Sequence, residues 1–122
     1  GHPFTADDIL YWWEGESEFI EHSHLEWIKI AGQIANIIQV DPYTVKFVFP
    51  LPHSLLLERM ASTFEYYSPK HYLEKYHPEL GDDTLIESTM KAMNIPTRQG
   101  LYLKMKDHIN EIRVFEVIEF FF

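Results

Sequence analysis

Hydrophobic residues recur at helical spacing near the start of the chain. Thr5 stands just before this run and Asp8 follows three residues later, which is the pattern of a capping box at a helix N-terminus. Gly15 is where we expect the helix to end. The aromatic and aliphatic positions fall at intervals typical of one helix face, so the sequence predicts an amphipathic helix that buries them. These positions are Ile9, Trp12, Trp13 and Ile20.

A second pattern begins after Gly32. Residues 33–40 are rich in β-branched side chains, residues 41–43 (DPY) favour a turn, and residues 44–49 alternate between apolar and polar positions. The sequence therefore predicts a β-hairpin that ends at Pro50, because proline donates no hydrogen bond to a sheet. The side chains expected on the buried face are Val45, Phe47 and Phe49.

The remaining segments are mostly helical in pattern. Residues 53–61 predict a short amphipathic helix, and Ser68 followed by Pro69 is typical of a helix start in which serine is the N-cap. Residues 82–94 predict a further helix. The pattern of residues 100–108 leaves helix and strand open, and residues 109–122, which end in three phenylalanines, resemble a strand.

Helices and strands are grouped rather than alternating, which favours an α+β fold with several short helices packed on a small antiparallel sheet. The length of 122 residues predicts a single domain over 1–122. A net charge of −9 argues against a nucleic-acid partner, since phosphates are bound by clustered lysine and arginine. No apolar stretch approaches the ~20 residues of a membrane-spanning helix, so we expect no transmembrane segment.

Residues with catalytic or metal-binding potential are present without a recognisable motif. His22 and His24 would point to the same side of a strand and could share a zinc ion, but no further ligand pattern joins them. Glu14, Glu18 and Glu21 are expected to form a solvated helix face. There is no cysteine, no G-x-S-x-G elbow and no glycine-rich phosphate loop. The sequence therefore predicts no enzyme, no metal site and no cofactor.

Exposed aromatic side chains are the remaining candidates for contact with a ligand, because rings offer large and rigid contact areas. Trp12 and Trp13 belong to the helical stripe, and we expect them in the core. Tyr66 and Tyr67 lie in an aromatic link between two predicted helices, together with Phe64. Tyr66 and Tyr67 are the predicted ligand-binding residues.

Taken together, four segments resemble the family 5 extracellular solute-binding proteins, the peptide and nickel receptors of ABC importers. Each segment alone is only a capped helix or a hairpin, but all four occur in the order found in that family. The resemblance is clear over residues 1–78 and weak beyond them. The segments are 3–14 (PFTADDILYWWE), 40–47 (VDPYTVKF), 50–61 (PLPHSLLLERMA) and 68–75 (SPKHYLEK).

The resemblance implies a transport protein rather than an enzyme. It places the chain in the extra subdomain of the first lobe of a periplasmic-binding-protein type II fold, as part of a longer receptor. Such a receptor captures oligopeptides or a similar small solute by lobe closure and delivers it to an ABC permease. It implies a periplasmic or extracellular location with a lipoprotein anchor. Because both lobes enclose the ligand, we expect weak or no solute binding by this chain alone.

Two other functions are consistent with the residues. One is a stand-alone acidic interaction or oligomerisation domain, in which the tail Phe120–Phe122 mediates contact between copies. The other is a metal-dependent hydrolase, which would require His22 and His24 to bind the metal.

Overall fold

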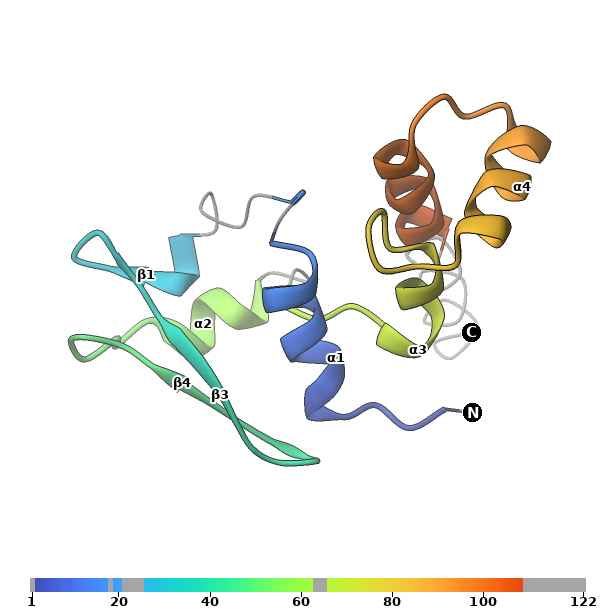
Figure 1. Ribbon diagram of the computed structural model, residues 1–122. Helices are drawn as coiled ribbons and strands as arrows, with labels where there is room; N and C mark the ends of the chain where they lie inside the picture. The colour runs from blue at the N-terminus through green and yellow to red at the C-terminus, as the bar shows by residue number, and fades with distance from the viewer. Residues whose placement is uncertain (1, 18, 21–25, 63–65, 109–122) are drawn as a thin grey trace, which may run out of the picture. The chain divides into compact units, whose positions relative to one another are not determined.

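The structure is a computed structural model that describes residues 2–17, 19–20, 26–62 and 66–108. Helices and short antiparallel strands form a mixed α+β fold, which confirms the predicted fold class. The chain divides into two compact units, Gly1–Lys70 and His71–Phe122. The sequence pattern did not predict this division, and each unit is described separately (Figure 1).

The first unit opens with the predicted capped helix. Helix α1 (Ala6–Leu10) continues as one π-helical turn, η1 (Tyr11–Gly15). The capping box is present, and the Thr5 N–H donates to Oδ2 of Asp8 at 2.9 Å. The helix ends at Gly15, where a Cβ atom would lie only 2.8 Å from the Tyr11 ring. The capped start and the glycine stop are therefore both confirmed, whereas the expected place of Ile20 on the same helical face is wrong, because Ile20 follows the end of the helix.

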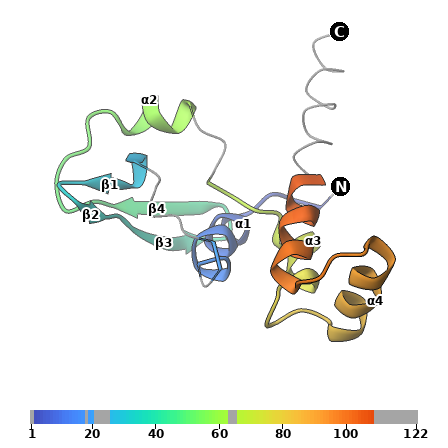
Figure 2. The same cartoon turned by 90° about the horizontal axis from the view of Figure 1, so that it is seen from above.

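The predicted hairpin is also confirmed. Strand β3 (Asn36–Asp41) pairs antiparallel with β4 (Thr44–Val48), and Ile37 stands opposite Phe47. Helix α1 lies beside this hairpin in the view from above (Figure 2). The predicted inward face is the one that contacts the core, because its residues pack against the buried cluster of the unit. These residues are Val45, Phe47 and Phe49.

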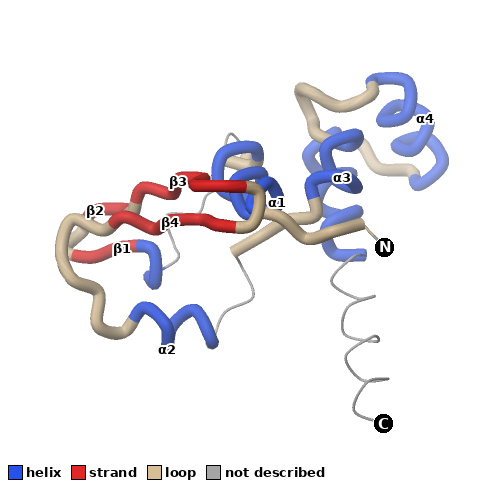
Figure 3. Tube along the Cα trace, turned by 90° about the horizontal axis from the view of Figure 1, so that it is seen from below, coloured by secondary structure: helices blue, strands red, loops and turns tan. Residues whose placement is uncertain are grey.

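The strand expected over residues 33–40 is interrupted. Strand β2 (Gln33–Ile34) pairs with β1 (Lys29–Ile30), and β3 begins only after Ala35. The turn between β1 and β2 has positive φ angles, 50° at Ala31 and 74° at Gly32. This left-handed turn reverses the chain and produces a second, smaller hairpin (Figure 3).

The core of the first unit is built from one helix, the segment before β1 and the two hairpins. Its buried members are Trp12, Trp27, Ile28, Ala35 and Ile37. Helix α2 (Leu56–Ala61) packs against this cluster through Leu56 and Met60, and it is shorter than the predicted 53–61. His53 stands before α2, and its Nε2 lies 3.0 Å from the carbonyl oxygen of Trp27.

The described part of the second unit is helical. Helix α3 (Lys70–Leu73) crosses the unit boundary and continues as η3 (Glu74–Tyr76), followed by α4 (Asp83–Met93). The Asp82 side chain accepts the Leu85 N–H at 3.0 Å, and Asn94 closes α4 in the left-handed conformation. The helix predicted over 82–94 is confirmed. Residues 98–108 are helical, which includes the range 100–108 that the sequence left open.

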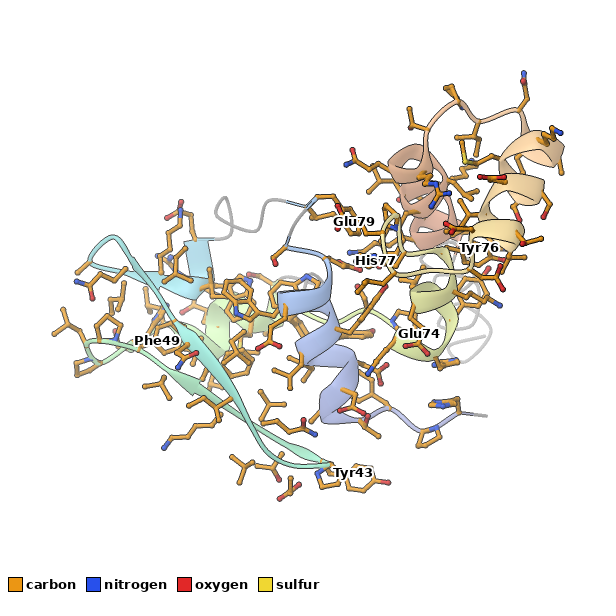
Figure 4. The ribbon with its side chains drawn as sticks, viewed as in Figure 1. Tyr43, Phe49, Glu74, Tyr76, His77 and Glu79 are labelled. Carbon is orange, nitrogen blue, oxygen red and sulfur yellow. The ribbon has the colours of Figure 1, made fainter. Side chains whose placement is uncertain are left out.

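A tight turn joins η3 to α4 around His77, which is 2 % exposed. Its Nδ1 atom accepts the N–H groups of Glu79 and Leu80 at 3.2 and 3.1 Å, and its carbonyl oxygen accepts the Gly81 N–H at 2.9 Å (Figure 4). The His77 ring thus accepts hydrogen bonds from two backbone N–H groups inside the turn.

Two side chains of this unit have shifted pKa values. Arg98 donates to Asp83 at 2.6 Å and to the Pro78 carbonyl at 3.2 Å, and the bond to Asp83 raises the pKa of Arg98. Burial and the neighbouring Tyr76 raise the pKa of Tyr72 above 10.0. Both shifts have structural causes and do not mark a reactive group.

Several predicted features lie outside the described residues. They are the strand over 109–122, Glu18, Glu21, His22, His24 and Phe64. Within the described ranges, no helix is long and apolar enough to cross a membrane.

Candidate functional site

The two predicted ligand-binding tyrosines occupy the middle of a row of aromatic rings. Both are half-buried, and their ring centroids are 5.4 Å apart. Tyr66 meets Trp27 edge-to-face, with centroids 6.4 Å apart and planes at 88°. Tyr67 meets Phe4 in the same way, at 5.0 Å and 80°. Tyr66 therefore packs against the core, whereas Tyr67 contacts the exposed ring of Phe4.

The inner end of the row is buried. Trp12 is 1 % exposed and stacks on Trp27, with centroids 6.0 Å apart and planes at 15°. Trp13 is half-buried and lies 5.6 Å from Trp12, so both tryptophans of the helix pack at the core as predicted. Trp27 was not singled out from the sequence, because its neighbours show no regular period that would mark it as buried.

Trp27 carries a buried donor without an acceptor. The residue is 4 % exposed, and its Nε1 atom has no hydrogen-bond partner in the described structure. Phe47 and Tyr66 both meet this indole edge-to-face, at 5.8 and 6.4 Å. An unsatisfied buried donor costs about 1–3 kcal/mol, so the surrounding rings must offset this cost by their burial.

Asp8 fixes the segment that carries the two tyrosines. The residue is 5 % exposed, and its two carboxylate oxygens serve different partners. Oδ2 accepts the Thr5 N–H, and Oδ1 accepts the Lys70 N–H, each at 2.9 Å. The Asp8 carbonyl oxygen accepts the Ser68 N–H at 3.0 Å. One aspartate therefore caps α1 and also holds residues 68–70 against it.

The predicted role of Ser68 as an N-cap is wrong. Its side chain is fully buried, and its hydroxyl has no hydrogen-bond partner among the described residues. The N–H of Lys70, the first residue of α3, is instead accepted by Asp8, 62 positions earlier in the chain. A carboxylate accepts such a bond more strongly than a hydroxyl, which explains why the distant residue takes the capping role.

We predict that Ser68→Ala leaves the free energy of unfolding of the first unit unchanged or raises it by up to about 1 kcal/mol, since it removes a buried group without a partner. Urea denaturation followed by tryptophan fluorescence measures this change. As a control, Ser62→Ala removes a hydroxyl that does donate, to the Arg59 carbonyl at 2.8 Å, and should lower stability slightly. A loss above 1 kcal/mol for Ser68→Ala would show that its hydroxyl is bonded.

The outer end of the aromatic row reaches the surface beside the β3–β4 turn. Phe4 is 55 % exposed, and Tyr43 at the hairpin tip is 75 % exposed (Figure 4). The Ala6 N–H donates to the Pro42 carbonyl at 2.9 Å, which joins the start of α1 to this turn. From the sequence, residues 41–43 were predicted only to form a turn, so the exposure of the Tyr43 side chain was not predicted.

Other chemistry-bearing residues are not brought together in the described structure. No group of three or more histidine, aspartate or glutamate side chains that could hold a metal lies within the described ranges. Glu14 is exposed, as expected of a solvated helix face. Glu16, two residues further along the chain, is fully buried, which the sequence gave no reason to expect.

Taken together, the first unit presents aromatic rings and carboxylates suited to non-covalent contact. Comparison with known proteins found no match, either to the models of protein families or among curated proteins.

Proposed function

We propose that this chain is part of the substrate-binding component of an ABC importer, a receptor that captures oligopeptides or a similar small solute outside the cytoplasmic membrane. One observation carries the proposal. Three of the segments that resemble family 5 solute-binding proteins, and residues 68–70 at the start of the fourth, lie in the first unit, where residues of each contact residues of another. Residues of the segments that carry the resemblance therefore contact one another within a folded unit.

The first, second and fourth segments are joined by backbone hydrogen bonds. Ala6 of the first segment donates to Pro42 of the second at 2.9 Å, and Lys70 of the fourth donates to Asp8 of the first at 2.9 Å. The Ser68 N–H adds a bond to the Asp8 carbonyl at 3.0 Å. All five of these residues are within the motifs themselves, which supports a shared architecture over a chance likeness of sequence.

The third segment reaches the same core through its side chains. Leu56 and Met60 pack against the buried cluster that contains Trp12, a residue of the first segment. His53 contacts the Trp27 carbonyl oxygen at 3.0 Å. Three segments and the first three residues of the fourth therefore contribute to one small folded unit.

In this proposal the chain works by binding and not by covalent chemistry. A solute would be enclosed by two lobes of the longer receptor and passed to the permease, and a lipid anchor would hold the receptor at the membrane. The first unit would act as a rigid support of one lobe. No cofactor and no catalytic residue takes part.

The size and binding behaviour of the natural protein test this proposal. We expect its intact mass to be several times 14.5 kDa. We also expect calorimetric titration with oligopeptides to give a Kd of about 1 μM or tighter for the longer protein and no such binding for this chain. Tight saturable binding by the 122 residues alone would contradict the proposal.

The same measurements separate the second candidate, a stand-alone acidic interaction domain. One observation favours it: the outer face of the hairpins exposes apolar side chains, namely Ile34, Ile38 and Val48. A natural mass of 14.5 kDa, together with a dimer in size-exclusion chromatography, would support this candidate and exclude the receptor.

A further inference from the structure

Exposed phenylalanine, tyrosine and tryptophan side chains are few in the described ranges. Phe4 and Tyr43 are the exposed aromatic residues of the described ranges, at 55 % and 75 %. The other described phenylalanine, tyrosine and tryptophan side chains are buried or half-buried. Both exposed residues belong to the first unit: Phe4 lies two residues before α1, and Tyr43 lies in the turn of the β3–β4 hairpin, where Figure 4 labels it.

Backbone and side-chain contacts hold this end together. The Ala6 N–H bonds to the Pro42 carbonyl at 2.9 Å, directly beside Tyr43 in the chain. The Gln39 side chain donates to Oδ1 of Asp7 at 3.3 Å, which gives a second connection between α1 and the hairpin. Phe4 rests edge-to-face on Tyr67. The rings are thus presented by two elements fixed to each other.

Two exposed carboxylates accompany the rings. Asp7 lies three residues after Phe4, in the first turn of α1, and Asp41 lies two residues before Tyr43 and accepts its N–H at 2.8 Å. Each uses its Oδ1 atom in these internal bonds, while Oδ2 has no hydrogen bond and neither carboxylate forms an ion pair within the described structure. Acceptors for an external donor are therefore present on both sides.

This combination suits a planar cation. An aromatic face attracts a cation through its quadrupole, and arginine does this more often than lysine. A guanidinium also donates two parallel hydrogen bonds to a carboxylate. The net charge of −9 adds long-range attraction for a basic partner.

We propose that this surface, formed by Phe4, Asp7, Asp41 and Tyr43, binds an arginine-containing segment of a partner protein. Tyr43 and Phe4 provide the ring faces, and the two free Oδ2 atoms accept the guanidinium donors. The proposal does not depend on the receptor function, because the surface is formed by the first unit alone. Contact is weak and ionic, as expected of an exposed site of this size.

The test uses the full chain with the probe peptide acetyl-Gly-Arg-Gly-Arg-Gly-amide. Amide shifts are followed by heteronuclear NMR during titration, and the control peptide carries citrulline, which keeps the shape of arginine without its charge. We expect saturable shifts at Phe4, Asp7, Asp41 and Tyr43 with a Kd near the millimolar range. Binding should be weaker in high salt, because salt screens the charges. The citrulline peptide should bind at least about threefold more weakly.

Two variants examine the two kinds of contact. Tyr43→Leu keeps an apolar side chain without the ring face, and Asp41→Asn keeps the acceptor for the Tyr43 N–H without the charge. Each should weaken binding about two- to fivefold. Leu57→Ala is the matched control and should have no effect on binding. Leu57 is 80 % exposed in the same unit, but it belongs to α2, which contributes no residue to the proposed binding surface.

Three results would overturn the proposal. They are equal binding of the citrulline peptide, shifts that spread over the unit without a centre at Tyr43, and no shifts at millimolar peptide. None of these results bears on the receptor proposal, which is tested by tight binding of solute and by the mass of the natural protein.

Discussion

Replacing Asp8 by alanine should destabilise the Gly1–Lys70 unit by about 2–4 kcal/mol. The carboxylate is 5 % exposed and accepts the N–H groups of Thr5 and Lys70, each at 2.9 Å. Alanine would leave both donors without an acceptor and would remove the cap of α1. Urea denaturation followed by tryptophan fluorescence measures the loss specifically, since all three tryptophans belong to this unit.

Asp8→Asn is the matched control. Its amide oxygen can accept one of the two N–H groups, while its amide nitrogen would face the other donor. We expect Asp8→Asn to lower the free energy of unfolding by less than Asp8→Ala does. If the alanine variant unfolds at the wild-type urea concentration, the carboxylate does not hold residues 68–70 to α1, and the proposed meeting of the motif segments loses its strongest contact.

The second large effect is expected at Gly81. A Cβ atom there would lie 2.6 Å from the carbonyl oxygens of both His77 and Lys75, and 2.9 Å from the His77 nitrogen. These are backbone atoms that cannot rotate away, so Gly81→Ala must open the turn before α4. We expect a loss of about 3 kcal/mol or more in the second unit, measured as an earlier loss of helical circular dichroism on heating.

Gly32→Ala provides the comparison. Gly32 has a positive φ of 74°, but a Cβ atom there would meet nothing within 4 Å. Its substitution should cost only about 1 kcal/mol of backbone strain, and in the first unit. Tryptophan fluorescence should respond to Gly32→Ala and not to Gly81→Ala. Equal losses for the two variants would show that close backbone contact is not the reason for glycine at position 81.

Local sequence patterns were sufficient to predict those helices and strands whose ends are fixed by residues nearby in the chain. Helix α4 was predicted because residues 82–84 favour a helix start and residues 94–96 a stop; in the structure Asp82 accepts the Leu85 N–H and Asn94 closes the helix in the left-handed conformation. The β3–β4 hairpin was predicted because alternation and turn residues lie together in the chain. Such interactions span a few residues and can be read directly from the sequence.

Long-range interactions account for what was missed. Ser68 has the local features of an N-cap, yet Asp8 takes its place from 62 residues away. Trp27 joins the core through rings that come from α1, β4 and the segment before α3. No pattern within a short window contains that information, since it depends on which elements meet after folding.

The candidate binding residues were predicted only in part. Tyr66 and Tyr67 do form part of the aromatic row, but both are half-buried, and Tyr66 packs against the core. Tyr43 was read as a turn residue, although its side chain is the more exposed one. Exposure depends on how the hairpin tip projects from the unit, which the sequence does not encode locally.

The hydrogen bond between Asp8 and Lys70 also constrains when the first unit can form during synthesis. Its two partners are the second acidic residue of the chain and the last residue of the unit. Helix α1 has only five residues and cannot persist by itself, since isolated helices of that length are unstable in water. In a nascent chain, the segment around α1 should therefore stay unfolded until residue 70 has left the ribosome.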